Sequence, residues 1–390
     1  MSSLPTADDV MGLLRGVVDP ELGSDIVDLG MAKGATVDAD GLVVVRVALT
    51  TSGCPLRAQL QRDIRARVGS LPGVSKVQIE WSELTQAEKN HTMATARRNI
   101  AERAPVTALP PTARVLMIAS GKGGVGKSSV TVNLAAAMAA DGLTIGVIDA
   151  DIWGFSVPRM LGIDGRLAGA ETAKKIRPHS LVMGKGRIEV VSMGLLVDDE
   201  ETALMWRGLI LQRAVRHFLE DVEWSHDLDY VLIDMPPGTG DVQMGLAKLL
   251  PRAEMIVITT PSRSAQKVAF RAVNMGRQNY LRIAGVIENM SEFVTPDGQR
   301  FPIFGTGGGD ELAADSGTPL LGRIPIEASV AEGGDIGSPI ALGVGPAADE
   351  FRRLARLIID EVAPTTDLAG CSVRLLDAAN AALAAHDAAS

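Results

Sequence analysis

A glycine-rich segment with two lysines and a serine carries the clearest chemistry in this sequence of 390 residues. It reads Gly121-Lys-Gly-Gly-Val-Gly126-Lys127-Ser128 and matches the Walker A pattern. Glycines let successive backbone N–H groups converge on phosphate oxygens, and a following helix adds a favourable dipole. We expect Lys127 to contact the β- and γ-phosphates of ATP and the Ser128 hydroxyl to ligate Mg²⁺. The residues predicted to bind the nucleotide are Gly121, Lys122, Gly123, Gly124, Val125, Gly126, Lys127, Ser128 and Ser129.

Acidic residues follow two of the predicted strands. Asp149 and Asp151 come directly after the second strand of this region, and Asp234 follows the strand Tyr230–Ile233. Ligands in open α/β sheets gather at the carboxyl ends of strands, so we expect these carboxylates to converge on the phosphates. Asp234 has the Walker B role of holding Mg²⁺ through water, and Asp149 is assigned to the same metal site. The alternative is that each aspartate only caps a helix.

Short apolar runs alternate with helical stretches from residue 114 onward, and this alternation predicts the fold class. Such runs indicate a mostly parallel sheet covered by helices on both faces, the α/β architecture of a P-loop NTPase. The strand Val115–Ala119 precedes the glycine-rich segment, and the helix Ser128–Ala140 follows it. The other predicted strands are Ile145–Ile148, Ile188–Ser192, Tyr230–Ile233, Met255–Thr259 and Ala284–Ile287.

The chain divides into four predicted segments. Residues 1–82 form a small α/β domain, 83–111 a helical and proline-rich linker, 112–363 the P-loop ATPase domain, and 364–390 a tail. In the small domain we expect a helix capped by Thr6 with Asp9, which runs through Val10, Leu13 and Leu14. A strand at Leu42–Leu49, a helix from Pro55 to about Val68 and a strand at Val74–Trp81 complete it.

Composition excludes several classes of protein. Hydrophobic residues make up 46% of the chain and charged residues 22%, which indicates a globular protein. The formal net charge of −9 argues against nucleic acid as the main partner. No run of about 18 or more apolar residues occurs, so we expect no membrane span. Only Cys54 and Cys371 are present, so no disulfide framework is expected, and we predict a cytoplasmic location.

The lysine that directly follows Gly121 places the loop in a recognisable group. This form resembles the deviant Walker A ATPases, which include the MinD/ParA positioning proteins, the nitrogenase iron protein and the arsenite-pump ATPase. The resemblance implies that Lys122 reaches the nucleotide of a partner subunit in an ATP-dependent homodimer. It also implies that Asp151 orients the attacking water and that Asn289 hydrogen-bonds the adenine.

Five ordered motifs narrow the resemblance to the Mrp/ApbC family, over roughly residues 114–360. They are Asp149-Ala-Asp-Ile-Trp-Gly154, Trp206-Arg207-Gly208, Asp234-Met-Pro-Pro-Gly-Thr-Gly-Asp241, Glu288-Asn-Met-Ser291 and Ile303-Phe-Gly-Thr-Gly-Gly308. Members of this family are ATP-hydrolysing carriers of iron–sulfur clusters. The resemblance therefore implies a Mg²⁺-dependent ATPase whose partners are iron–sulfur apoproteins and assembly factors.

The N-terminal 82 residues resemble the small domain, linked to metal–sulfur cluster biosynthesis, that often precedes such an ATPase. The matching segments are Asp19-Pro-Glu21, Ile26-Val-Asp-Leu-Gly30 and Thr50-Thr-Ser-Gly-Cys-Pro55.

The sequence departs from the family at the cluster-binding loop. Family members commonly place Cys-x-x-Cys between the Glu-Asn-Met-Ser and Phe-Gly segments, whereas residues 292–301 here contain no cysteine. Cys54 is then the candidate cluster ligand, because a thiol at the start of a helix gains thiolate character. The equal alternative is a buried packing thiol. Cys371 lies outside the matched region and is interpreted as incidental.

Three functions follow from these residues. The first is an ATPase that carries iron–sulfur clusters and transfers them to apoproteins. The second is a MinD/ParA-like dimerisation switch, which would need a basic amphipathic helix or patch for its membrane or DNA surface. The third is a regulator that binds ATP and no cluster, since the cysteine pair is absent.

Overall fold

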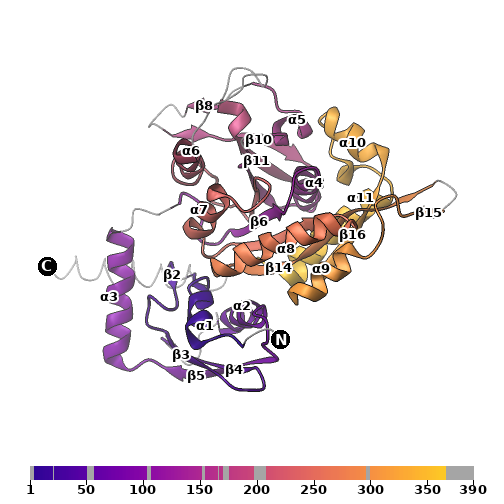
Figure 1. The fold of residues 1–390 in the computed structure, drawn as a ribbon. Helices are drawn as coiled ribbons and strands as arrows, with labels where there is room; N and C mark the ends of the chain where they lie inside the picture. Colours follow the sequence, from indigo (N-terminus) through magenta and orange to yellow (C-terminus); the bar gives the residue numbers. More distant parts are fainter. Residues whose placement is uncertain are drawn as a thin grey trace.

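A mostly parallel sheet forms the centre of the larger of two units in the computed structural model (Figure 1). The structure describes residues 4–20, 22–50, 57–102, 107–151, 154–165, 167–169, 175–196, 208–295 and 299–365. Among these residues the strand order is β10-β11-β7-β12-β6-β13-β14-β15, with β16 paired to β14. The strands β10 and β15 pair antiparallel with their neighbours, and the others are parallel. The predicted fold class is therefore confirmed.

The strands of this sheet include all six that the sequence predicts. Their bounds are β6 Arg114–Ser120, β7 Thr144–Asp149, β10 His179–Met183, β11 Gly186–Ser192, β12 Tyr230–Asp234, β13 Glu254–Thr259, β14 Arg282–Val294, β15 Arg300–Phe301 and β16 Leu320–Ile326. Three outer strands, β10, β15 and β16, were not predicted. The pattern along β10 alternates between half-buried and exposed residues, so it lacks the continuous apolar run of the central strands.

Helices cover both faces of the sheet, and successive side chains of β6 point to alternate faces. Leu116 and Ile118 pack with α4 and α11 on one face, whereas Val115 and Met117 pack with α6, α7 and α8 on the other. The helices of this unit are α4 Lys127–Ala140, α5 Val157–Met160, α6 Gly208–Glu220, α7 Asp241–Leu249, α8 Arg263–Gln278, α9 Gly308–Ser316, α10 Ala328–Asp335 and α11 Pro346–Leu357. Short 3₁₀ turns lie at Met193–Leu196 and Ile340–Leu342, a π-helical turn at Ile358–Val362, and a small hairpin pairs β8 Ala168–Gly169 with β9 Ile176–Arg177.

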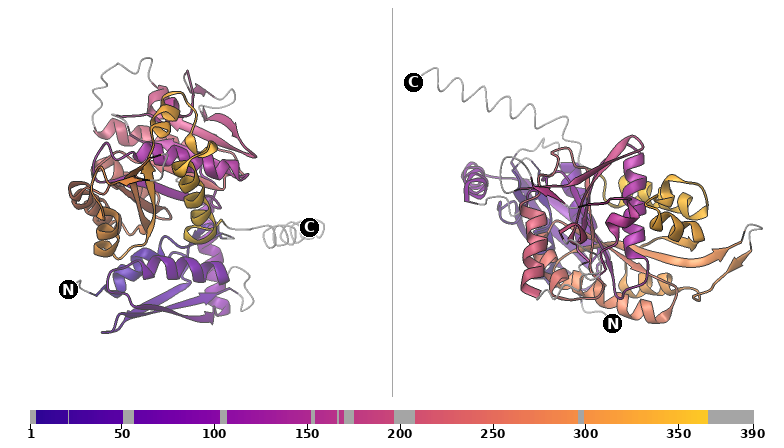
Figure 2. Two further views of the ribbon diagram at one scale, coloured as in Figure 1. Left: turned by 90° about the vertical axis from the view of Figure 1, so that its right-hand side faces the viewer. Right: turned by 90° about the horizontal axis from the view of Figure 1, so that it is seen from above.

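The smaller unit is a three-stranded sheet with helices toward the larger unit (Figures 1 and 2). Thr6 and Asp9 form the predicted capping box at the start of α1. The elements of the unit are α1 Ala7–Leu14, β1 Val18–Asp19, β2 Ser24–Asp25, β3 Ala32–Val37, β4 Leu42–Leu49, α2 Arg57–Gly69, β5 Lys76–Glu83 and α3 Gln86–Glu102. The predicted start of α2 at Pro55 lies outside the described residues, and so does the predicted tail from residue 366 onward.

The small unit contacts the large one at the amino-terminal ends of the parallel strands. Arg67 of α2 is 2% exposed, and its Nη2 donates to the carbonyl of Arg252 at 2.5 Å, just before β13. Asp63, one turn earlier, accepts from Nη2 of Arg114 at 2.9 Å, where β6 begins. Arg282 at the start of β14 pairs with Glu254 at the start of β13 at 2.6 Å. A buried network of charges therefore joins the two units on the edge opposite the glycine-rich loop.

No helix in the described parts of the chain combines the length and apolar character that a bilayer crossing needs.

We predict that Arg67→Ala lowers the free energy of unfolding by about 2 kcal/mol, because it leaves the carbonyls of Pro251 and Arg252 without their donor. Urea unfolding of the full chain measures the effect. Arg65→Ala, an exposed position on the same helix, is the matched control and should change stability by less than about 0.5 kcal/mol. Equal effects of the two substitutions would contradict the proposed docking.

Candidate nucleotide-binding site

The glycine-rich loop joins the end of β6 to the start of α4, and its shape requires glycine at defined places. Gly124 and Gly126 have φ values of 77° and 79°, in the left-handed region that suits glycine. A Cβ on Gly121 would lie 2.2 Å from the carbonyl carbon of Val268 in α8, so only glycine allows this approach. Next to Gly124, by contrast, a Cβ would meet nothing within 4 Å. The loop is thus packed tightly at its base and open at its tip, as a phosphate cradle must be.

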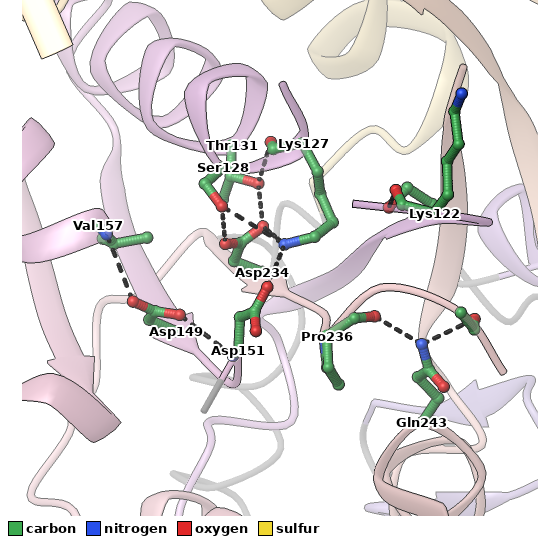
Figure 3. Close-up of polar contacts among 12 residues, drawn as sticks. Lys122, Lys127, Ser128, Thr131, Asp149, Asp151, Val157, Asp234, Pro236 and Gln243 are labelled. Atoms are coloured by element: carbon green, nitrogen blue, oxygen red, sulfur yellow. Dashed lines mark hydrogen bonds and ion pairs between the residues drawn. The ribbon is translucent and has the colours of Figure 1, made fainter. Parts of the chain in front are cut away.

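Asp234 gathers the hydroxyl and ammonium groups of the loop around one buried carboxylate (Figure 3). Lys127 Nζ donates to Oδ1 of Asp234 at 2.6 Å, and Ser128 Oγ donates to Oδ2 at 2.5 Å. The hydroxyl of Thr131 adds a third bond to Oδ1 at 3.1 Å. A serine hydroxyl beside a strand-end carboxylate is the oxygen donor set that Mg²⁺ uses in P-loop proteins. The residues present therefore fit Mg²⁺ and a phosphate group. When a phosphate is bound, it would replace Asp234 as the partner of the Lys127 ammonium.

Asp151 is the second carboxylate beside Lys127 (Figure 3). Its carboxylate is 3.7 Å from the lysine Nζ and lines the same cavity as the loop. Burial raises the pKa of Asp151, and the charge of Lys127 opposes that rise. A carboxylate at the wall of the cavity can accept a hydrogen bond from a water near the phosphates. This position suits the predicted role of Asp151, which stays a prediction.

Asp149 is fully buried and is held by the loop after β7 (Figure 3). Ser192 Oγ donates to its carboxylate at 2.9 Å, and the backbone N–H groups of Val157 and Asp151 donate at 3.3 and 3.2 Å. Burial, and secondly the charge of Asp234, raises the pKa of Asp149 to about 8. The structure therefore places Asp149 behind Asp151, where it positions the loop. A direct bond from Asp149 to Mg²⁺ stays a prediction.

The two lysines of the loop point in different directions. Lys122 Nζ lies 3.3 Å from the Ser264 hydroxyl in the first turn of α8, whereas Lys127 turns inward to Asp234 (Figure 3). The ammonium of Lys122 is therefore directed away from the phosphate cradle of its own chain. The cavity itself has a volume of about 410 Å³. Its lining includes Lys122, Gly123, Gly124, Val125, Gly126, Lys127, Ser128, Ser129, Asp151 and Pro237.

Asn289 approaches the loop from the extended strand β14. Its side-chain amide donates to the carbonyl of Val125 at 2.9 Å, and Met290 beside it has a φ of 56°. A left-handed non-glycine residue is uncommon and turns the strand at this point. Glu288 accepts from the N–H of Gly309 at 2.6 Å, at the start of α9. The Glu288–Ser291 motif thus contacts the phosphate loop and the start of α9, while the predicted contact of Asn289 with adenine stays a prediction.

Three residues of the site were not predicted from the sequence. Thr131 lies one helical turn after Lys127, so the helix period could have indicated it. Ser264, the partner of Lys122, had no comparable signal because 142 positions separate the two residues. Gln243 of α7 donates to the carbonyls of Pro236 and Gly238 at 2.5 and 2.7 Å and so holds the loop after β12 (Figure 3).

Several predicted site positions lie outside the described residues. They are Cys54, Cys371, the pair Ile152 and Trp153, the pair Trp206 and Arg207, and residues 296–298.

Comparison with known proteins gives two family matches. Residues 112–359 match the family model described as ParA, the NUBPL iron-transfer P-loop NTPase. Residues 7–81 match the model of an iron–sulfur cluster assembly protein.

Individual relatives extend over most of the chain. It is 39% identical over 353 residues to the iron–sulfur cluster carrier protein of Mycobacterium leprae, which covers 88% of this chain and 90% of that protein. It is 41% identical over 336 residues to the protein of the same name from Mycobacterium bovis, with 84% and 86% covered. Among solved structures, a nucleotide-binding protein from Archaeoglobus fulgidus in complex with ADP aligns with 33% identity and a TM-score of 0.49. That alignment covers 57% of this chain and 86% of the other.

We predict that Lys127→Ala lowers the affinity for ATP by about 100-fold, because the phosphate charge loses a buried cation. Calorimetric titration of the folded variant measures this. Lys185→Ala, which removes an exposed lysine outside the cavity, serves as the control and should bind as the wild type does. Near-normal affinity for ATP in a folded Lys127→Ala protein would contradict the assignment of the nucleotide site to this loop.

Proposed function

Because the chain belongs to the NUBPL-type family of iron-transfer P-loop NTPases, we propose that it is a Mg²⁺-dependent ATPase that carries iron–sulfur clusters to apoproteins. The observation that carries the proposal is the convergence of Lys127, Ser128 and Asp234, next to a second carboxylate, Asp151. The partners of such a carrier would be assembly factors, which supply the cluster, and apoproteins, which accept it. Its proposed place is the cytoplasm, where thiols stay reduced.

The hydrolytic step requires a base or water-positioning group and positive charge near the γ-phosphate. Asp151 would orient the attacking water from the cavity wall, and Lys127 would stabilise the charge that develops on the phosphoryl oxygens. Asp234 and Ser128 would hold Mg²⁺, which would supply positive charge beside the phosphates. Asp149 would act through the loop that it anchors, because its carboxylate accepts hydrogen bonds from that loop, from the end of β11 and from the start of α5.

A homodimer would complete the site. Lys122 does not turn toward the phosphate cradle of its own chain, and its ammonium rests on Ser264 at the rim. In a sandwich of two copies, the same lysine would be free to reach the nucleotide of the partner subunit. This arrangement would make turnover depend on dimerisation.

We predict that Lys122→Ala lowers ATP turnover by at least about 10-fold while affinity for ATP changes little, since the lysine would act on the partner subunit. Asp151→Asn should likewise bind ATP, lose hydrolysis, and accumulate as an ATP-bound dimer. Steady-state kinetics and size-exclusion chromatography with ATP measure both effects. Full activity of both variants, together with an oligomeric state indifferent to ATP, would rule out the sandwich.

The loop that would bind an iron–sulfur cluster supports a second candidate function. The hairpin of β14 and β15 occupies the place of the family's cysteine pair and projects from the body of the large unit (Figures 1 and 2). Its residues 292–301 contain no cysteine, and iron in a cluster prefers thiolate ligands. A nucleotide-dependent switch or regulator that binds no cluster is therefore the alternative. Cys54 is the proposed ligand if a cluster is carried.

We predict that the wild type takes up iron and sulfide at less than one cluster per dimer and that Cys54→Ser abolishes this uptake, because it removes the soft donor. Iron and sulfide analysis after anaerobic reconstitution measures the occupancy. Cys371→Ser is the matched control and should keep the wild-type content, and both variants should keep ATPase activity. Equal cluster content in wild type and Cys54→Ser would exclude this cysteine. Absence of a cluster from all three proteins would favour the regulator.

A further inference from the structure

A cleft of about 500 Å³ lies between the small unit and the large unit, far from the glycine-rich loop. Residues of both units and of the connecting segment line it. They include Arg15, Ser24, Asn99, Leu109, Lys248 and Arg252. The cleft is adjacent to the charge network that holds α2 against the starts of β6 and β13, since Arg252 belongs to both. It is therefore at the edge of the sheet opposite the nucleotide site.

Arg252 is the unusual group in this cleft. Its side chain is partly buried, and this burial lowers the pKa of Arg252 to about 10. The side chain makes one hydrogen bond, from Nη2 to the carbonyl of Leu109 at 3.4 Å. No carboxylate in the described parts of the chain forms an ion pair with it. A partly buried charge without a counter-ion is stabilised when an anion neutralises it.

The acidic residues closest to Arg252 have other partners. Asp63 and Glu254 line a small neighbouring cavity with it, but they pair with Arg114 and Arg282. Asp25 lines the cleft itself, and its Oδ1 accepts from the backbone N–H groups of Val27 and Asp28. Arginine residues elsewhere in this interface are thus matched with carboxylates or carbonyls at short distance, whereas Arg252 is not.

The remaining walls of the cleft suit an anion with a short apolar part. Lys248, in the last turn of α7, is exposed and adds a second cation at the rim. The Asn99 amide donates one bond to Ser24 Oγ at 3.2 Å and has a second N–H to offer. Val18 and Leu249 provide apolar surface between these groups. An arginine fork matches a carboxylate or a phosphate with two parallel hydrogen bonds.

We propose that this cleft binds a small organic anion bearing a carboxylate or phosphate group, which pairs with Arg252. The ligand would touch both units and the segment between them, so its binding would favour the docked arrangement by mass action. The site is distinct from the nucleotide cavity and goes beyond the proposed carrier function. The concentration of such a metabolite would then influence how stably the two units are docked.

The test uses the full chain saturated with Mg²⁺ and ADP, so that the glycine-rich loop does not compete for the probe. Inorganic phosphate and succinate are titrated separately by calorimetry at constant ionic strength set with chloride. We expect at least one of them to bind with a dissociation constant on the order of 1 mM or lower. Binding of phosphate alone identifies a phosphorylated ligand, and binding of succinate alone identifies a carboxylate.

Arg252→Gln should weaken that binding by at least about 10-fold, because it removes the charge and the bidentate fork. Arg271→Gln, an exposed arginine on α8 outside the cleft, is the matched control and should bind as the wild type does. No binding of either probe by the wild type, or equal affinity in the two variants, would overturn the proposal.

A second pair of variants keeps the test decisive if Arg252→Gln does not fold. Lys248→Gln at the rim should weaken the same binding several-fold, whereas Lys267→Gln on the exposed face of α8 should not. Identical titrations of Lys248→Gln and Lys267→Gln would overturn the proposal.

Discussion

A single buried carboxylate, Asp234, is the group on which the nucleotide site depends. It has no exposed surface, so its charge must be neutralised within the protein, and Lys127, Ser128 and Thr131 supply three donors. These donors all come from the first turns of α4. The pairing of β12 directly beside β6 places the carboxylate under that helix. The curvature of the glycine-rich loop and the position of α4 are therefore consequences of one electrostatic requirement.

The two ends of the parallel strands make different kinds of contact. At the carboxyl ends of the strands, the loops are open and carry glycine, lysine and aspartate around a cavity. At the amino ends, Arg67 of the small unit and the pairs of Arg114 and Arg282 are buried against one another. Strand β6 is thus bound to the docked unit at its amino end, through Arg114 and Asp63, and leads into the glycine-rich loop at its carboxyl end.

The family relationship and the local chemistry disagree at one place. The chain belongs to a family of iron-transfer NTPases, yet the β14–β15 hairpin has Phe293 paired with Phe301 and no thiol between them. Phe301 and its neighbours Ile303 and Phe304 are exposed, so apolar side chains lie on the surface at the end of the hairpin and just after it. The residues proposed to bind the nucleotide and Mg²⁺ lie together, whereas a cluster would need ligands from outside this hairpin.

The sequence by itself determined the fold class, the six central strands, the capping box of α1 and the nucleotide loop. Those features are local, because glycine conformations, strand alternation and cap hydrogen bonds depend on neighbours within a few residues. Only the tertiary structure decided which groups surround Asp234, which direction Lys122 takes, and that Asp149 anchors a loop. It alone also showed that Arg252 lacks a carboxylate partner among the described residues, in an interface that Arg67 joins across 185 positions of the chain. Such contacts join residues brought together by strand order and domain docking, and no short-range pattern encodes those distances.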